Sequence, residues 1–255
     1  MSIFTLLESK LDKTKLKYAD LLEKRGVPEI AGITFMLYSL DQIFRNFVFE
    51  QIEEGIVDST YRAEAHDYGI DAIYLSSSNQ YLMSIDELDN YNEDSKFTFH
   101  LLQFKKGRGI AQADLLKLKE GIQTAFIDGN IREDRNEYFY NRMTEILEIR
   151  NALYEKFSAD QIAIKIYIVF GGIKTTVTTD TLLMKQIDDI EKLLKENGYM
   201  NVNIEIIDTN LLFDIENKGD EIVDIIESEK TLKYLTETST GMIFPRNSRH
   251  PVKLP

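Results

Sequence analysis

Cysteine is absent from this chain of 255 residues, and its absence excludes several kinds of chemistry. Without a thiol the protein forms no disulfides, holds no metal through thiolates and uses no cysteine nucleophile. This composition fits a reducing compartment, so we expect a cytoplasmic protein. The chain begins Met1-Ser2-Ile3 with no basic region ahead of an apolar block, and we therefore expect no secretory signal.

Long apolar runs are missing as well. No stretch approaches the roughly 20 uninterrupted apolar residues that a membrane-spanning helix needs, so we expect no membrane partner. Hydrophobic residues still make up 43% of the chain and charged residues 29%. These proportions are typical of a globular protein that buries a proper core.

Positive charge is scarce, because 30 Lys and Arg residues face 43 Asp and Glu residues, a net charge of −13. A general nucleic-acid binder usually has a basic surface, so this class is disfavoured. A nuclease is not excluded, since an active site built of carboxylates is itself acidic and a bound metal offsets that charge. The sequence also lacks a serine–histidine constellation for a hydrolase triad and the glycine patterns that bind nucleotide phosphates.

Hydrophobic periodicity predicts the order of helices and strands. Helical patterns cover residues 6–22, 29–54, 111–126, 131–157 and 181–197. Strand patterns cover residues 70–75, 97–105, 162–170 and 202–207. The early strands can be joined as hairpins, whereas the later ones alternate with helices and need crossovers. The sequence therefore predicts an α/β fold with a mixed central sheet flanked by helices, in two or three layers.

Two of these strands carry polar residues where a purely structural strand would keep apolar ones. Asp71 comes directly before Ala72-Ile73-Tyr74-Leu75. Gln103 and Lys105 are two residues apart, so they point to the same face of their strand. A strand face that turns polar at its exit suggests a cleft at that edge. An acid, an amide and an ammonium brought together there can hold a divalent metal and orient a water, as in phosphodiester hydrolysis.

In this hypothesis Asp71 is a hard oxygen ligand for Mg²⁺ or Mn²⁺. A second oxygen comes either from the Gln103 side chain or from the Phe104 backbone carbonyl. Lys105 positions the attacking water or stabilises the charge that builds up on the scissile phosphate. Asp71, Gln103 and Lys105 are thus the candidate catalytic residues, and the first two are candidate metal ligands.

One carboxylate is a thin basis for a metal site, and a helix could supply another. Glu50 is the first choice as a catalytic and metal-binding acid, because it shares a helix face with Ile43 and Phe47 and is expected to point inward. Other acids are close in sequence, and each can equally be a plain surface residue: Glu53, Glu54, Glu64 and Asp67.

The segment that follows the second strand is the most cationic part of the chain. Between Gln103 and Lys119 it holds five basic residues and one acid, Asp114. We expect Lys106 and Arg108, which adjoin the proposed site, to contact nucleic-acid phosphates. Lys117 and Lys119 are explained as readily by a solvated helix face.

The residues of these two strands resemble a known family. Gly69-Ile70-Asp71-Ala72-Ile73-Tyr74 and Gln103-Phe104-Lys105-Lys106-Gly107 together resemble the PD-(D/E)XK nuclease superfamily, most closely its Mrr-like branch, where glutamine replaces the second acid. Residues 47–52, 55–58 and 67–71 are similar to the N-terminal region of abortive phage infection (AIPR) proteins. One departure is Tyr68, which stands where the usual run has a glycine.

The resemblance implies a restriction endonuclease-like core laid over roughly residues 37–170. It also implies Mg²⁺-dependent cleavage of DNA or RNA in phage defence. By residue it places the metal carboxylate on Asp71, the second motif position on Gln103, the lysine on Lys105 and a helical glutamate on Glu50.

We expect an N-terminal helical extension over residues 1–36, a nuclease-like α/β domain over 37–215 and a C-terminal helix with a flexible tail over 216–255. The expected partner is nucleic acid, DNA in preference to RNA, and a homo-oligomer is compatible with the sequence. The alternative is a catalytically inactive, nuclease-like module that binds or regulates within a larger defence complex. The missing second acid and the negative charge favour this alternative.

Overall fold

The computed structural model describes residues 2–25, 30–64, 66–78, 80–82, 84–133 and 136–218. Residues 1–216 group into one compact unit. The domain boundaries expected from the sequence stay predictions, and the expected tail lies outside the described residues from position 219 onward. Among the described residues, no helix combines the length and the apolar character that crossing a membrane requires.

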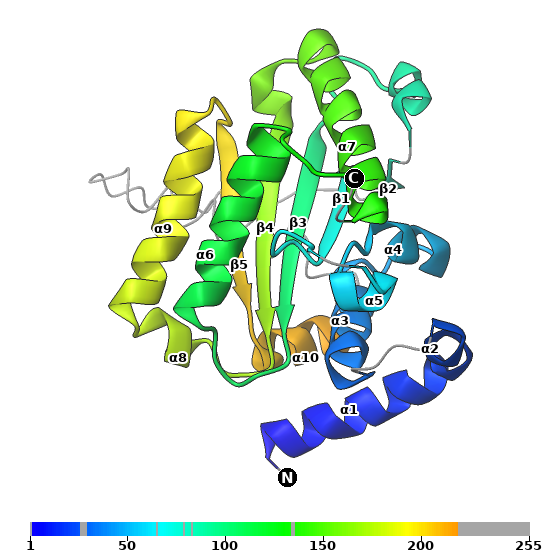
Figure 1. Ribbon diagram of the computed structural model, residues 1–255, viewed down its shortest axis with the longest axis vertical. Coiled ribbons are helices and arrows are strands. Elements are labelled where there is room, and N and C mark those ends of the chain that lie inside the picture. The colour runs from blue at the N-terminus through cyan, green and yellow to red at the C-terminus, as the bar shows by residue number, and fades with distance from the viewer. Residues whose placement is uncertain are drawn as a thin grey trace, which may run out of the picture. The chain divides into compact units, whose positions relative to one another are not determined.

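A five-stranded sheet forms the centre of this unit, with the strand order β2-β1-β3-β4-β5 (Figure 1). The strands are β1 (Ala72–Ser77), β2 (Gln80–Tyr81), β3 (Phe97–Lys105), β4 (Ile162–Phe170) and β5 (Asn201–Ile207). β1 runs antiparallel to β2 and β3, whereas β3, β4 and β5 are parallel to one another. The prediction of an α/β fold with a mixed sheet flanked by helices is confirmed.

Helices cover both faces of the sheet, which makes three layers. Figure 1 shows one group in front of the strands: α6 (Gln112–Gly121), α7 (Glu137–Lys156) and α9 (Thr181–Glu196), with the short α8 (Thr175–Thr178) beside them. The opposite core is built with α1 (Ile3–Lys17), α2 (Ala19–Arg25), α3 (Ile30–Ile43), α4 (Phe49–Gly55), α5 (Ser59–Arg62) and α10 (Thr209–Lys218).

The central strand β4 shows why this architecture follows from the sequence. Ile164, Ile166 and Ile168 pack into the core beneath α6, α7 and α9, while Tyr167 and Val169 pack into the core on the other side. A strand with both faces covered needs apolar side chains at nearly every position. The apolar run in the sequence therefore correctly indicated an interior strand covered on both faces.

Helix bounds differ more from expectation than strand bounds do. The pattern predicted over 29–54 forms two helices, α3 and α4, separated by a turn in which the Phe44 and Phe47 rings stack at a centroid distance of 4.9 Å. The pattern over 111–126 becomes α6 followed by a π-helix, η2 (Ile122–Ile127). Two short 3₁₀ helices, η1 (Ile85–Asn90) and η3 (Ala159–Gln161), complete the elements described.

Candidate metal centre

The pairing of β1 with β3 brings Asp71 to the exit of β3. Ala72 pairs with Leu102 and Ile73 with Leu101, so the next pair in this antiparallel register is Asp71 with Gln103. The Asp71 amide donates to the Leu102 carbonyl at 2.8 Å. The Asp71 carboxylate in turn accepts a hydrogen bond from the Phe104 amide at 2.5 Å. The backbone of two strands thus fixes this carboxylate at the sheet edge.

Two further carboxylates converge on Asp71. Oxygens of Asp58, Asp67 and Asp71 all lie within 4.8 Å of one another, a group that could hold a metal ion. Asp58 caps the N-terminus of α5, where its Oδ1 accepts the Tyr61 amide at 2.7 Å. The amides of Val57 and Asp58 both donate to the Asp71 carbonyl at 2.9 Å. These bonds tie the start of α5 to the start of β1.

Asp67 lies in a loop of unusual backbone conformation. The φ angles of His66, Tyr68 and Gly69 are 63°, 53° and 74°. Left-handed conformations are strained for residues other than glycine and persist where the surroundings enforce them. Here the Asp67 carboxylate accepts the Gly69 amide at 2.9 Å and the Ser59 hydroxyl at 2.7 Å. The strained loop therefore holds this acid towards α5 and Asp71.

Close packing against α6 sets the position of the same loop. A Cβ on Gly121 of α6 would lie 1.8 Å from the Tyr68 carbonyl oxygen. A Cβ on Gly69 would lie 2.9 Å from the Leu118 amide nitrogen, in a backbone conformation that already favours glycine. Both glycines allow a backbone-to-backbone contact that no larger residue permits.

Gln103 and Lys105 lie on one face of β3 and meet the same residue of α6. Lys105 Nζ lies 3.1 Å from the Asp114 carboxylate. The Gln103 side-chain nitrogen donates to the carbonyls of Asp114, at 3.2 Å, and Gly69, at 3.1 Å. Gln103 Oε1 is buried and has no hydrogen-bond partner among the described residues. That oxygen is therefore an unused hydrogen-bond acceptor and an oxygen of the kind that hard cations bind.

The charges in this group shift one another's pKa values. Burial, followed by the charges of Asp58 and Asp67, raises the pKa of Asp71 well above the ordinary value of 3.8. Burial also raises the pKa of Asp67, but the Lys117 ammonium, 2.6 Å away, and the Gly69 and Ser59 hydrogen bonds outweigh it, so the net shift is downward. The ionised form of Asp71 is thus the less favourable of the two, because the nearby positive charges do not compensate for its burial and for the neighbouring acids.

Lys105 stays protonated in these surroundings. Burial lowers its pKa, but the neighbouring carboxylates of Asp71 and Asp114 outweigh burial and raise the pKa overall. A lysine ammonium next to a carboxylate group is available to donate hydrogen bonds to an incoming anion.

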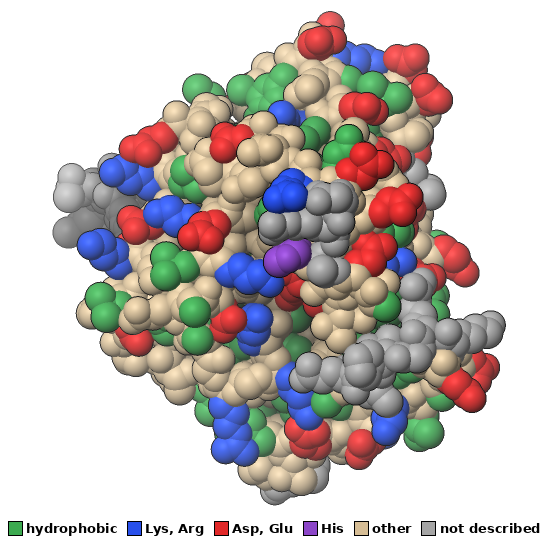
Figure 2. All heavy atoms as spheres, in the orientation of Figure 1, with side chains coloured by type: hydrophobic (Ala, Val, Ile, Leu, Met, Phe, Trp, Pro, Cys, Tyr) green, Lys and Arg blue, Asp and Glu red, His purple; other side chains and the backbone are tan. Residues whose placement is uncertain are grey.

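The acids border a cavity of about 450 Å³. Its charged lining residues are Asp58, Asp67, Asp71, Lys105, Lys106 and Lys117. α3 contributes an uncharged part of the lining, which consists of Ala31, Gly32, Ile33 and Met36. Figure 2 shows basic and acidic side chains intermixed over this face, with side chains of both kinds next to one another near its middle. Three carboxylates that could hold a cation and three lysines therefore line the same cavity.

The structure separates the predicted site residues into two groups. Asp71 and Lys105 line the cavity, with Gln103 buried beside them, and Lys106 lines it too while pairing with Glu8 at 3.3 Å. Two predicted residues lie elsewhere. Arg108 places its guanidinium 4.0 Å from the centre of the Phe4 ring.

Glu50 is exposed on α4 and is not among the residues that line the cavity, although it was expected to point inward. The reason lies in the packing of α4, which turns Ile52 and Gly55 towards the core. A Cβ on Gly55 would overlap the Tyr74 ring, so this part of α4 lies flat against β1. Asp58 and Asp67 are the acids that lie next to Asp71 instead.

Sequence reasoning missed Asp58 and treated Asp67 as one of several surface acids. Asp58-Ser59-Thr60 is a typical helix N-cap, which explains Asp58 without any ligand. Asp67 and Asp71 lie on either side of Gly69 in the run of residues 67–71. This spacing is the sequence signal from which a shared site for the two acids could have been predicted. Lys117, weighed as a solvated lysine, is bonded to Asp67 at the cavity.

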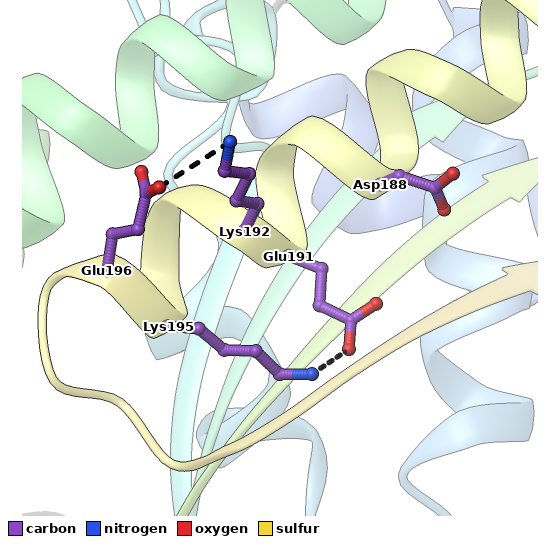
Figure 3. A pocket seen from close by; sticks show the side chains of 5 residues that line it. All are labelled: Asp188, Glu191, Lys192, Lys195 and Glu196. Carbon is purple, nitrogen blue, oxygen red and sulfur yellow. Dashed lines mark hydrogen bonds and ion pairs between the residues drawn. The ribbon is translucent and has the colours of Figure 1, made fainter.

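A second hollow, of about 430 Å³, lies along the outer face of α9 (Figure 3). It is lined by Asp188, Glu191, Lys192, Lys195 and Glu196. Lys195 pairs with Glu191 at 2.6 Å and Lys192 with Glu196 at 3.6 Å, both one helical turn apart. Two of the three acids on this helix surface are therefore paired with a lysine of the same helix, unlike the group of Asp58, Asp67 and Asp71.

Comparisons with protein-family models, with curated proteins and with solved structures found no match for this chain.

Proposed function

We propose that this protein is a metal-dependent nuclease that hydrolyses phosphodiester bonds. The observation that supports the proposal is the group of three carboxylates within 4.8 Å of one another, open to a cavity that Lys105 also lines. A divalent ion held by carboxylates beside a lysine can promote the attack of water on a phosphodiester.

The donor set suits Mg²⁺ or Mn²⁺. All the candidate ligands are oxygens, which these hard cations prefer. At an effective dielectric constant of about 20, two unit charges 4.8 Å apart repel by about 3.5 kcal/mol. A divalent cation would relieve this repulsion at Asp58, Asp67 and Asp71. When bound, it would polarise a phosphoryl oxygen and neutralise charge that builds up there.

The chain's own residues have separate tasks in this proposal. Lys105, oriented by Asp114, donates hydrogen bonds to a non-bridging oxygen of the scissile phosphate and stabilises its growing charge. The Phe104 amide holds the Asp71 carboxylate in place while the substrate binds. The Gly69 and Ser59 bonds do the same for Asp67. Positioning of this kind lowers the reorganisation that the reaction needs.

We extend the proposal to the kind of core and the setting. The order of α4, β1, β3, α6 and β4, with Asp71 and Lys105 at neighbouring strand ends, supports a restriction endonuclease-like core. A role in phage defence, with DNA in preference to RNA as substrate, rests on the sequence resemblance.

An inactive, nuclease-like binding module is the second candidate, and two ion pairs favour it. Lys117 already pairs with Asp67 at 2.6 Å, and Lys105 with Asp114 at 3.1 Å. Lysines that neutralise the acids directly could replace a cation. In that case the cavity binds nucleic acid without turning it over.

Cleavage by purified variants separates the two candidates. Asp71→Ala and Lys105→Ala should each abolish Mg²⁺- or Mn²⁺-dependent cleavage of labelled oligonucleotides while the circular dichroism spectrum stays native. Lys119→Ala is the matched control, because Lys119 pairs with Asp189 at 3.7 Å and does not line the cavity. Cleavage that survives both site variants, or wild-type protein that cleaves nothing at any metal concentration, contradicts the nuclease proposal.

A further inference from the structure

The depth of the acids limits what can reach them. The side chain of Asp67 is 7% exposed, whereas that of its partner Lys117 is 53% exposed. Asp71 is 7% exposed, and the Lys105 side chain 34%. The lysines therefore lie nearer to solvent than the acids of the same cavity. A phosphate that approaches an ion held by the acids has to enter the cavity instead of resting across its mouth.

The wall formed by α3 carries no charged side chain among its described lining residues. It consists of Ala31, Gly32, Ile33 and Met36, whereas the charged residues come from the segments around α5, β1, β3 and α6. A phosphate suits the charged side, and a sugar with its base suits the uncharged side. The volume of about 450 Å³ is within the range of sites that enclose a small ligand.

Gly32 leaves room on this wall. A Cβ built on Gly32 would have no heavy atom from another described part of the chain within 4 Å. Glycine inside a helix is less favourable than most other residues, and no described neighbour requires it at this position. The space in front of Gly32 is therefore part of the cavity and is available to a ligand.

We propose that nucleic acid enters this cavity as a single strand, with one nucleotide unstacked from its neighbours. Its phosphate lies towards Asp71 and Lys105, and its sugar and base lie against the α3 wall at Gly32. This inference rests on the proposed function and adds the substrate class. In a duplex the bases are stacked inside, and extracting a nucleotide requires free energy for unpairing and unstacking. A single strand presents splayed bases without that penalty.

The test compares one oligonucleotide as a single strand and as a duplex, with Gly32→Phe and Gly32→Ala proteins. Phenylalanine at this position adds bulk to the α3 wall, both substitutions leave Asp58, Asp67 and Asp71 in the chain, and both raise helix propensity. Single strands should be cleaved at least about tenfold faster than duplexes, and Gly32→Phe should slow single-strand cleavage by about tenfold, equal to the loss of one base contact. Gly32→Ala, which fills much less of the cavity, should slow single-strand cleavage less than Gly32→Phe does. Mn²⁺ binding, followed by electron paramagnetic resonance, should be the same in all three proteins.

Duplex cleaved as fast as single strand, or Gly32→Phe protein as active as wild type, overturns the inference. If wild type binds Mn²⁺ but cleaves nothing, the proposed function fails, and fluorescence anisotropy decides the inference separately. Single-strand binding that is weakened more by Gly32→Phe than by Gly32→Ala supports it. Equal binding of single strand and duplex, equal binding by the two variants, or no binding at all overturns it.

Discussion

Replacing Asp71 with asparagine should stabilise the metal-free protein, the reverse of the usual result for a buried, hydrogen-bonded residue. Burial and the charges of Asp58 and Asp67 make the ionised form of Asp71 unfavourable. Asparagine has the same shape without the charge, and its side-chain oxygen can still accept the Phe104 amide. The substitution therefore removes the repulsion and keeps the hydrogen bond.

The distances set the size of this effect. At the upper limit of 4.8 Å for their separations, and at an effective dielectric constant of about 20, a pair of ionised acids repels by about 3.5 kcal/mol. The ammonium groups of Lys105 and Lys117 offset much of this repulsion. We expect Asp71→Asn to raise the free energy of unfolding by about 1–2 kcal/mol at pH 7 in the presence of a chelator.

The pH dependence has a defined sign. The pKa of Asp71 is higher in the folded state than in the unfolded state, so folding takes up a proton at pH values between the two. The contribution of Asp71 protonation to stability is fully present below the unfolded-state value of 3.8, and it is lost as pH rises through the folded-state pKa. Wild type should therefore lose stability relative to Asp71→Asn over this range. The lowered pKa of Asp67 acts in the opposite direction but is present in both proteins.

Urea unfolding followed by circular dichroism measures these changes. Mg²⁺ at about 100 times its dissociation constant should add about 2.7 kcal/mol to wild type and much less to Asp71→Asn. Asp41→Asn is the control, since Asp41 binds Lys17 and Tyr18 away from the cavity; it should lower stability and keep the Mg²⁺ response. An Asp71→Asn protein less stable than wild type in chelator at pH 7, with an unchanged Mg²⁺ response, would refute the reasoning.

Three more predictions follow from other contacts. Gly121→Ala should lower the free energy of unfolding by about 2–3 kcal/mol in urea titrations, because its Cβ would lie 1.8 Å from the Tyr68 carbonyl; it should weaken Mn²⁺ binding too, and native stability would contradict the packing described. Lys117→Met should raise the pKa of Asp67 and destabilise the metal-free protein, yet tighten Mn²⁺ binding in calorimetry, since the ammonium 2.6 Å from Asp67 no longer competes; weaker binding would make Lys117 a supporting residue. His100→Leu should lower the free energy of unfolding by about 1–3 kcal/mol and leave cleavage unchanged, because His100 is buried and hydrogen-bonded to two hydroxyls. Burial also lowers the pKa of His100 to about 3, so the ring is neutral. A large loss of cleavage at native stability would assign His100 to the site.

Strands were more predictable than helices in this fold. β3 and β4 have the bounds that the sequence indicated, because a strand covered on both faces shows its extent as an apolar run. The division into α3 and α4 was not predictable in the same way, since both halves keep a helical period. At the turn between them the Phe44 ring packs against Tyr74 of β1, at a centroid distance of 4.6 Å. Such long-range contacts leave no local signal.

The same distinction holds at the site. Strand alternation and neighbouring strand exits were enough to place Asp71, Gln103 and Lys105 together. Asp58 and Asp67 reach Asp71 through a helix cap and a loop with positive φ angles, which depend on close packing against α6. Periodicity carries no information about such turns, so the helical Glu50 was chosen in their place.

The central claim is that Asp58, Asp67 and Asp71 together hold a divalent ion beside Lys105. A crystal of the protein soaked in Mn²⁺ and measured for anomalous scattering tests this claim directly. The account predicts one strong peak at roughly 2.1 Å from oxygens of the three carboxylates, with the Lys105 ammonium facing the same cavity. A native structure at saturating Mn²⁺ with no peak there, and with Lys117 still paired to Asp67, would contradict it.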